Sequence, residues 1–448
     1  MGAFHAYDIR GEYNVDLDKE FAYKAGYFLP ELLKTDKVLV GRDMRVSSPE
    51  MHGWLLKGIT DAGADVYDLG LSTTPLVYYA TAKYGFKASV QITASHNPRE
   101  HNGMKVSREN ALPVAFDTGL STLKQWMEEG RPMPVAERRG TVHEMDIKKE
   151  YVEFQLKYKE DISNLKIGMD LSNGMASIFA RDLFGDQLEY ICEELDGTFP
   201  NHEANPLLAE NREMLVKLVL EKGCDVGVVY DGDADRVMFV DEKGEFVSPD
   251  LVIALLGHYF LEERGEKGIV LQDIRSSKAV AEYIAPMGGQ IATWKVGRAF
   301  AAPRLRELDG IYGGELAGHY YFKDFFYSDS GILASILVLN IVAALKRKGV
   351  KFSEAIGKIR RYENSGEINF RLERKKEAMD AVRDWFISQE QPTATMDFDG
   401  YRVEFREWWF NIRPSNTEPY LRFICEATSK ALLDEKVAKA REIIESFS

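Results

Sequence analysis

Apolar runs and polar turns alternate in a recurring order along most of the chain. In the first round, the apolar run 37–43 predicts a buried strand, and Ser47 and Pro49 begin a helix with a capping hydroxyl and a proline in its first turn. A strand over 64–69, a helix over 74–85 and a strand over 88–93 follow. This βαβαβ order indicates a parallel sheet with helices packed on it.

The same order occurs twice more. The second round has strands over 166–170, 188–193 and 225–230, with helices over 175–184 and 212–222. The third has strands over 268–272, 290–295 and 311–312, with helices over 277–286 and 299–308. The longest apolar run, 332–345, contains Ser335 and Asn340 and is shorter than the ~20 residues that a membrane span needs, so it predicts a buried helix.

The last part of the chain has a different pattern. Residues 367–372 and 401–413 alternate or run apolar like antiparallel strands, and 430–447 predicts an amphipathic helix. The predicted fold class is therefore α/β, with three repeated mixed α/β domains that contain βαβαβ units and a smaller C-terminal α+β domain. The expected boundaries are 1–147, 148–249, 250–364 and 365–448.

Composition limits the partners. The chain has 57 basic and 71 acidic residues, a net charge of −14, so we expect neither nucleic acid nor an anionic membrane as a partner. A local cluster of Arg and Lys can still bind a small anion, because salt screens charges beyond ~8 Å. Cys192, Cys224 and Cys425 are far apart and form no CxxC, so we expect neither disulfides nor a zinc site. Residues 1–10 lack a signal pattern, so we expect a cytoplasmic protein.

The third strand of each round leads into a loop with unusual chemistry. Ligands of open α/β sheets bind beyond the carboxyl ends of the strands, so the three loops are expected to share a cleft. Asp231, Asp233 and Asp235 form an oxygen-rich group that suits Mg²⁺. Three alternatives remain: a solvated acidic turn; a calcium loop ending at Glu242, which Arg236 disfavours by occupying the required glycine position; and a D-x-D-x-V phosphatase motif with Asp233 as nucleophile.

The other loops supply a nucleophile and groups that bind sugar and phosphate. Ser95 at a strand end is a candidate nucleophile, whereas His96 is a doubtful base because neighbours on a turn usually point apart. Glu315 can accept hydrogen bonds from sugar hydroxyls, and His319 can move a proton near neutral pH. A C-terminal loop has the composition of a phosphate clamp, formed by Arg413, Ser415, Asn416, Thr417 and Arg422.

Each of these loops, taken alone, also has an ordinary structural interpretation as a turn or connector. The chain contains no G-x-S-x-G, no G-x-x-x-x-G-K-[ST] and no G-x-G-x-x-G. These absences argue against an α/β-hydrolase, a P-loop NTPase and a dinucleotide enzyme.

Together, in this order, the four loops resemble those of the α-D-phosphohexomutase family. The matching segments span essentially the whole chain: 7–11 (YDIRG), 93–98 (TASHNP), 102–105 (NGMK), 231–236 (DGDADR), 313–319 (GGELAGH) and 413–419 (RPSNTEP). The resemblance implies four domains around a central cleft, carrying in order the phosphoserine, the metal, the sugar-binding loop and the phosphate-binding loop.

The resemblance also implies roles at the matching positions. Ser95 would be the phosphoserine and would bind Mg²⁺ through a phosphoryl oxygen, together with Asp231, Asp233 and Asp235. Lys105, His319 and Arg10 would transfer protons. The residues implied to contact substrate are Tyr7, Arg236, Arg275, Arg298, Glu315, Arg413, Ser415, Asn416, Thr417 and Arg422. The implied reaction interconverts hexose 1-phosphate and hexose 6-phosphate through a hexose 1,6-bisphosphate, which also serves as activator.

Details of the sugar-binding loop favour the phosphomannomutase/phosphoglucomutase branch of the family. Leu316 follows Glu315, where phosphoglucosamine mutases typically have Gln, so glucosamine phosphate is the alternative substrate. Three positions depart from the branch: Ala317 replaces the usual Ser, Arg298 stands where His is frequent, and Arg275 stands where Lys is common. An aspartyl-phosphate phosphatase and a non-catalytic sugar-phosphate sensor remain rival hypotheses, and we expect a monomer or homodimer.

Overall fold

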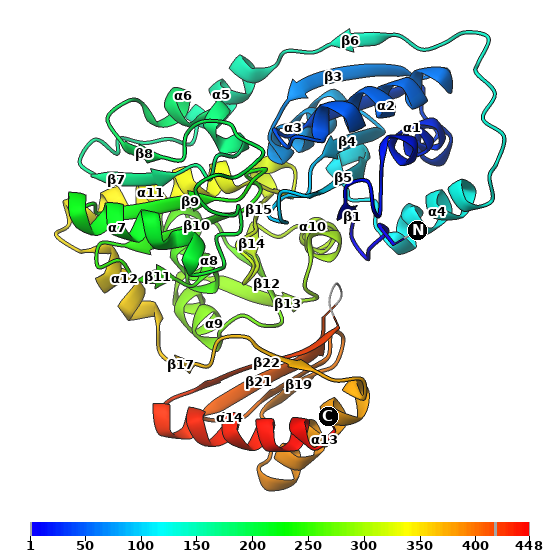
Figure 1. The fold of residues 1–448 in the computed structure, drawn as a ribbon. Helices are drawn as coiled ribbons and strands as arrows, with labels where there is room; N and C mark the ends of the chain where they lie inside the picture. The colour runs from blue at the N-terminus through cyan, green and yellow to red at the C-terminus, as the bar shows by residue number, and fades with distance from the viewer. Residues whose placement is uncertain (1, 416–418, 448) are drawn as a thin grey trace.

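The computed structural model describes residues 2–415 and 419–447. Four sheets follow one another along the chain, each with its own helices (Figure 1). The fourth unit, coloured orange to red, lies below the other three in Figure 1.

The first sheet has the strand order β1-β5-β4-β2-β3-β6. Its strands are β1 (Ile9–Glu12), β2 (Lys37–Arg42), β3 (Asp65–Leu71), β4 (Ala88–Ile92), β5 (His101–Arg108) and β6 (Val142–Glu144). The helices of this unit are α1 (Lys19–Leu33), α2 (Ser48–Asp61), α3 (Thr74–Tyr84) and α4 (Ser121–Glu128). Helix α3 begins where the Thr73 side chain accepts a hydrogen bond from the Leu76 N–H, and it ends at Gly85, whose φ of 69° suits glycine.

The second sheet has the order β11-β10-β9-β7-β8. Its strands are β7 (Ile167–Asp170), β8 (Glu189–Ile191), β9 (Val226–Tyr230), β10 (Val237–Asp241) and β11 (Phe246–Val247). Its helices are α5 (Lys148–Leu156), α6 (Ala180–Phe184) and α7 (Glu213–Lys222).

The third sheet has the order β13-β12-β14-β15-β16. Its strands are β12 (Gly268–Asp273), β13 (Gly289–Trp294), β14 (Tyr312–Gly314), β15 (Tyr320–Phe322) and β16 (Ser328–Asp329). Its helices are α8 (Pro249–Gly257), α9 (Lys278–Ile284), α10 (Arg298–Glu307), α11 (Gly331–Arg347) and α12 (Phe352–Ile359). Helix α11 is buried from Gly331 to Ala343, as its apolar sequence predicts.

The fourth unit is an antiparallel sheet of order β17-β22-β21-β20-β19, in which β18 also pairs with β22. Its strands are β17 (Glu363–Asn364), β18 (Ile368–Arg371), β19 (Ala394–Met396), β20 (Tyr401–Glu404), β21 (Trp408–Pro414) and β22 (Tyr420–Ala427). Helices α13 (Lys375–Gln389) and α14 (Lys430–Glu445) complete this α+β unit.

The hydrophobic core differs between the first three units and the fourth. One continuous apolar cluster joins the first three, and its members include Tyr79, Tyr151 and Phe325, one from each unit. The fourth unit has a separate core around Trp408 and Phe410. The first three units are therefore joined by apolar burial, whereas the fourth unit has polar contacts with the third, such as Arg275–Glu367 (3.3 Å) and Ser277–Glu426 (2.7 Å).

The predicted fold class is confirmed, but the sheets are mixed where βαβαβ units alone predict parallel ones. Strands β5, β10 and β15 run antiparallel to β4, β9 and β14, respectively. The helix predicted over 175–184 is a 3₁₀ turn over Met175–Ile178 followed by the short α6. Of the helices within the described ranges, none has both the length and the apolar character that a membrane crossing requires.

Candidate active site

The loop that carries Ser95 is held by hydrogen bonds from the buried Arg45 side chain. Ser95 follows β4 and has a left-handed φ of 52°, and its N–H donates to the Thr93 hydroxyl (2.8 Å). The Arg45 guanidinium is fully buried, pairs with Asp43 (3.3 Å) and donates to the backbone carbonyls of the loop. The four carbonyls, with their distances, are those of Ser95 (2.9 Å), Asn97 (2.7 Å), Pro98 (2.7 Å) and His101 (3.0 Å).

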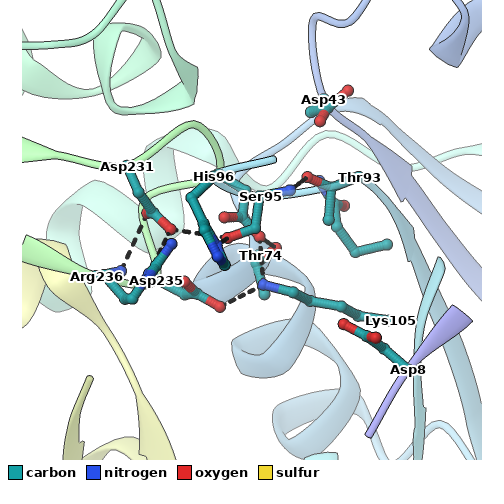
Figure 2. A network of polar contacts seen from close by, with 12 residues as sticks. Asp8, Asp43, Thr74, Thr93, Ser95, His96, Lys105, Asp231, Asp235 and Arg236 are labelled. Atoms are coloured by element: carbon teal, nitrogen blue, oxygen red, sulfur yellow. Dashed lines mark hydrogen bonds and ion pairs between the residues drawn. The ribbon is translucent and has the colours of Figure 1, made fainter. Parts of the chain in front are cut away.

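The acidic loop joins β9 to β10 and contacts the Ser95 loop directly. Asp231, Asp233 and Asp235 have no exposed surface, and the Ser95 hydroxyl donates to Asp231 Oδ2 (2.8 Å) (Figure 2). A Cβ on Gly232 would lie 2.5 Å from the Ser95 carbonyl oxygen, so only glycine permits this approach. The turn between β9 and β10 thus brings the serine and the carboxylates together from two different sheets.

Two cations compensate the three buried carboxylates. Lys105 Nζ from β5 lies 2.6 Å from Asp233 Oδ2 and also contacts Asp235, while Arg236 Nε donates to Asp231 (2.9 Å). Burial, together with repulsion from Asp235 and Asp233, raises the pKa of Asp231 to about 7 despite these cations.

These carboxylates fit a hard divalent cation. Asp233 Oδ1 and Asp235 Oδ1 are buried, and neither has a hydrogen-bond partner among the described residues. Unsatisfied buried carboxylate oxygens are costly unless a cation or donor meets them. The ligand atoms of Asp231, Asp233 and Asp235 lie within 4.8 Å of one another, and all are oxygens. Glu242, the last ligand of the alternative calcium loop, accepts a hydrogen bond from the backbone N–H of Ser353 (3.0 Å).

The prediction that His96 points away from Ser95 is wrong. The His96 ring nitrogen Nδ1 lies 3.4 Å from Ser95 Oγ, because the left-handed turn at Ser95 brings the two side chains to the same side. Burial and the nearby Arg236, Arg10 and Lys105 lower the pKa of His96 well below its ordinary value. The ring is therefore neutral at physiological pH.

The loop of the third unit places Glu315 and His319 near this centre. Tyr321 and the backbone N–H of Gly297 both donate to Glu315 Oε1 (3.1 Å each), and burial raises the pKa of Glu315 to about 7. His319 Nδ1 lies 2.7 Å from Asp329 Oδ2 and 3.9 Å from Asp235 Oδ1. An isolated antiparallel β-bridge between the backbones of Arg236 and His319 joins the acidic loop to this loop.

Arg298 links the third unit to the first. Its Nε donates to Asp329 (2.7 Å), its Nη2 donates to the Ala111 carbonyl (3.0 Å), and its guanidinium lies 3.6 Å from the centroid of the Tyr78 ring. The arginine that departs from the branch pattern thus contacts two residues of the first unit, and it shares Asp329 with His319.

Arg10 and Tyr7 approach the centre from the N-terminal segment. Arg10 donates to the Asn97 side chain of the Ser95 loop (2.8 Å) and to Asp8 (2.5 Å). The Tyr7 hydroxyl donates to the Val296 carbonyl (3.1 Å), and Val296 itself donates to Asp399 of the fourth unit (2.9 Å).

The predicted phosphate clamp forms a second group, between the third and fourth units. Glu367 accepts from Arg422 (2.9 Å) and from Arg275 (3.3 Å), so one carboxylate holds two guanidinium groups. Arg413 donates to Asp399 (3.1 Å). Ser415 follows β21, whereas Asn416 and Thr417 lie outside the described residues.

Several residues of the site escaped the sequence analysis. Asp43 and Arg45 follow β2 at its carboxyl end, so the rule that located the other loops also points to them. Thr74, which donates to Asp233, occupies the first turn of α3 and resembles an ordinary cap in the sequence. Asp329 carries no local signal, because its partners are distant in the chain.

A serine against three buried carboxylates, ringed by lysine and arginine from separate α/β units, is the arrangement of a phosphoryl-transfer enzyme. Comparison with known proteins agrees. Models of the phosphoglucomutase/phosphomannomutase alpha/beta/alpha domains I, II and III match residues 1–130, 147–244 and 248–362, and the model of the family's C-terminal domain matches 367–443.

Individual relatives match over nearly the whole chain. A phosphomannomutase of Escherichia coli is 37% identical over 460 residues, covering 99% of this chain and 98% of that protein. A protein of Xanthomonas campestris described as phosphohexose mutases is 35% identical, covering 97% of each chain. A crystal structure of a phosphoglucomutase/phosphomannomutase family protein from Burkholderia thailandensis has a TM-score of 0.88 at 27% identity and covers 99% of this chain and 97% of that one.

The chain belongs to the phosphoglucomutase/phosphomannomutase family. It is a phosphohexomutase and hence an isomerase, so the family resemblance inferred from the four loops is confirmed.

Proposed function

We propose that this phosphohexomutase interconverts the 1- and 6-phosphates of mannose, glucose or both, through a phosphoserine at Ser95 and a hexose 1,6-bisphosphate. The observation that carries the proposal is the Ser95 hydroxyl, which donates to Asp231 (2.8 Å) from a loop whose backbone carbonyls are held by the buried Arg45. The names of the relatives, phosphomannomutase among them, support the choice of sugars.

Asp231, Asp233 and Asp235 would hold Mg²⁺ with a phosphoryl oxygen on Ser95, and the bound ion would neutralise charge on the transferred phosphoryl group. Arg236 would share this task, because its Nη2 is buried and has no hydrogen-bond partner among the described residues. The Asp231–Arg236 pair (2.9 Å) holds that guanidinium beside the serine.

Proton transfer at the sugar hydroxyl is assigned to groups around the serine. His319 is oriented by Asp329, which fixes Nδ1 and leaves Nε2 for the substrate. Lys105 contacts Asp233, Arg10 donates to Asn97 of the Ser95 loop, and both would stabilise or relay charge there. Glu315 would accept hydrogen bonds from sugar hydroxyls.

The phosphate that is not transferred would bind at the boundary of the fourth unit. Arg413, Ser415 and Arg422 would bind it together with Asn416 and Thr417, and Arg275 would approach from the third unit. Glu367 now occupies the guanidinium groups of Arg422 and Arg275, as a phosphate would. Tyr7 and Arg298 would also contact the substrate.

The test uses Ser95→Ala and Asp233→Asn as separate variants. We expect Ser95→Ala to abolish conversion of glucose 1-phosphate to glucose 6-phosphate and to remove the phosphate from the intact mass of the protein. Wild-type turnover in Ser95→Ala contradicts the assignment. A phosphoenzyme that hydroxylamine cleaves, and that Asp233→Asn lacks, indicates an aspartyl-phosphate phosphatase instead.

A second assay addresses the sugar. It compares mannose, glucose and glucosamine 1-phosphates with Mg²⁺ and trace glucose 1,6-bisphosphate, and we expect the first two to be preferred. A preference for glucosamine 1-phosphate would identify the phosphoglucosamine mutase alternative. Binding of all three sugars without turnover would indicate the non-catalytic sensor.

We also propose that the protein acts in the cytoplasm as a monomer or homodimer. The support is the set of three cysteines, which are all free. Light scattering at several protein concentrations measures the oligomeric state.

A further inference from the structure

A second group of metal-binding side chains lies in the second unit, outside the site described above. Asp170 ends β7, Cys192 follows β8, and His202 lies further along the same connection toward α7. A carboxylate oxygen, the thiol sulfur and a ring nitrogen of these residues all lie within 4.8 Å of one another. The predicted reaction uses none of the three. The cysteine spacing argues against a zinc site, but here a single cysteine lies beside a carboxylate and an imidazole from other segments.

The backbone orients the ligand atoms toward a common centre. His202 Nδ1 donates to the Glu203 carbonyl (2.9 Å) and Nε2 donates to Asp170 Oδ2 (3.1 Å), so both ring nitrogens carry protons in the metal-free protein. Asp170 Oδ1 accepts from the Ser172 N–H (2.9 Å), so a cation at the centre would replace the proton between Nε2 and Oδ2. A metal-binding histidine typically donates its second ring N–H to a carbonyl or carboxylate in this way.

The donor set selects a different cation from Mg²⁺. One oxygen, one nitrogen and one sulfur suit a borderline-soft ion such as Zn²⁺, whereas the acidic loop offers oxygens alone. The Asp170 side chain has no exposed surface and that of His202 is 6% exposed, whereas Cys192 is half-buried and forms the open side. We propose that Asp170, Cys192 and His202 form a second metal site that binds Zn²⁺ through three protein ligands.

Binding at this site would involve only acid–base and coordination chemistry. The Cys192 thiol loses its proton as the Zn–S bond forms, and Nε2 of His202 binds with its lone pair after any proton on it leaves to solvent. Nδ1 keeps its proton and its bond to the Glu203 carbonyl. No electron transfer takes place, so no oxidant or reductant is required.

The site would fix the segment 192–202, which packs against Arg45. A Cβ on Gly197 would lie 2.6 Å from the Arg45 Cα, and the Phe199 ring centroid lies 5.1 Å from the Arg45 guanidinium. Arg45 in turn holds the Ser95 loop. A cation that joins Cys192 and His202 to β7 would therefore stabilise both ends of the segment that supports Arg45.

The experiment uses Co²⁺ as a spectroscopic probe on the full chain, in saturating Mg²⁺ so that the oxygen-only site is occupied. A thiolate bound to Co²⁺ absorbs strongly in the near ultraviolet. We expect this band in the wild type, its loss on addition of Zn²⁺, and its loss in Cys192→Ser. Cys224→Ser and Cys425→Ser are the matched controls and should keep it. His202→Asn and Asp170→Asn should weaken Zn²⁺ binding at least about tenfold, since loss of even a hydrogen-bonded partner of a metal ligand typically costs that much.

A second measurement keeps the test independent of how the variants fold. In wild-type protein, Zn²⁺ should slow the alkylation of the half-buried Cys192, mapped by mass spectrometry, and should leave the low reactivity of the buried Cys224 and Cys425 unchanged. Absence of the band together with unprotected Cys192 overturns the proposal and leaves a hydrogen-bonded cluster without a metal. A band that persists in Cys192→Ser also overturns it. Neither readout depends on turnover, so the outcome is separate from that of the mutase proposal.

Discussion

Replacing Lys105 with Met would remove the cation that compensates two buried carboxylates. Lys105 Nζ contacts both Asp233 and Asp235, its side chain is 13% exposed, and neither aspartate has exposed surface. Met preserves most of the side-chain volume, so the change removes mainly the charge and its hydrogen bonds.

The magnitude follows from the charges around Lys105. The substitution leaves Asp233 without its cation and leaves Asp235 with only His319, 3.9 Å away. Removing one partner of a buried ion pair typically costs about 3–5 kcal/mol. At ~2–4 °C per kcal/mol for a unit of 150–250 residues, the Tm should fall by about 6–20 °C.

Calorimetry with and without Mg²⁺ measures this. The divalent cation would use the same carboxylates, so it should restore much of the loss. The Mg²⁺-dependent rise in Tm should therefore be larger in Lys105→Met than in the wild type. Lys430→Met, which removes an exposed pair with Asp434, is the control and should leave the Tm nearly unchanged.

Two results would refute the reasoning. An unchanged Tm in metal-free Lys105→Met would show that the lysine does not compensate the buried aspartates. Equal stabilisation of both proteins by Mg²⁺ would show that the cation does not use Asp233 and Asp235.

Three further changes have defined outcomes. Burial raises the pKa of Glu315 from its ordinary 4.5 to about 7, so the folded state binds an extra proton between these two values. The Tm should therefore fall as the pH rises from 5 to 7. Glu315→Gln should flatten this fall, and the same dependence of Tm on pH in the variant and the wild type would contradict the reasoning. Arg298→Met should lower the Tm by removing the buried pair with Asp329 (about 3–5 kcal/mol) and should lower kcat through His319, with unchanged melts and kinetics as the contrary result. Chelation of divalent metal should abolish mutase turnover and Mg²⁺ should restore it, whereas full activity in excess chelator would exclude a required metal.

Local signals in the sequence account for the elements and for most of the candidate site. Strands and helices follow from short-range periodicity and caps, as in α3 between Thr73 and Gly85. The spacing of Asp231, Asp233 and Asp235 in one turn brings them together whatever the surrounding fold. Ser95 was found because it follows a strand end, where ligands of α/β sheets bind.

The antiparallel strands were less predictable. Strand β5 carries Lys105, but the pattern beside the turn motif predicts no strand there; it follows the Ser95 loop and pairs antiparallel with β4 from Ala88 and Arg108 onward. Periodicity identifies a strand but does not identify its partner, so the mixed character of the sheets came from the structure.

The sequence by itself determined the fold class, the four chemical loops and, through their order, the family. Only the tertiary structure showed that Arg45 holds the Ser95 loop, that Lys105 compensates two aspartates, and that Arg298 joins the third unit to the first. The physical reason is that turns and periodic faces depend on neighbouring residues, whereas buried charges are compensated by groups distant in the chain. Such pairings arise only once the sheets pack and exclude water.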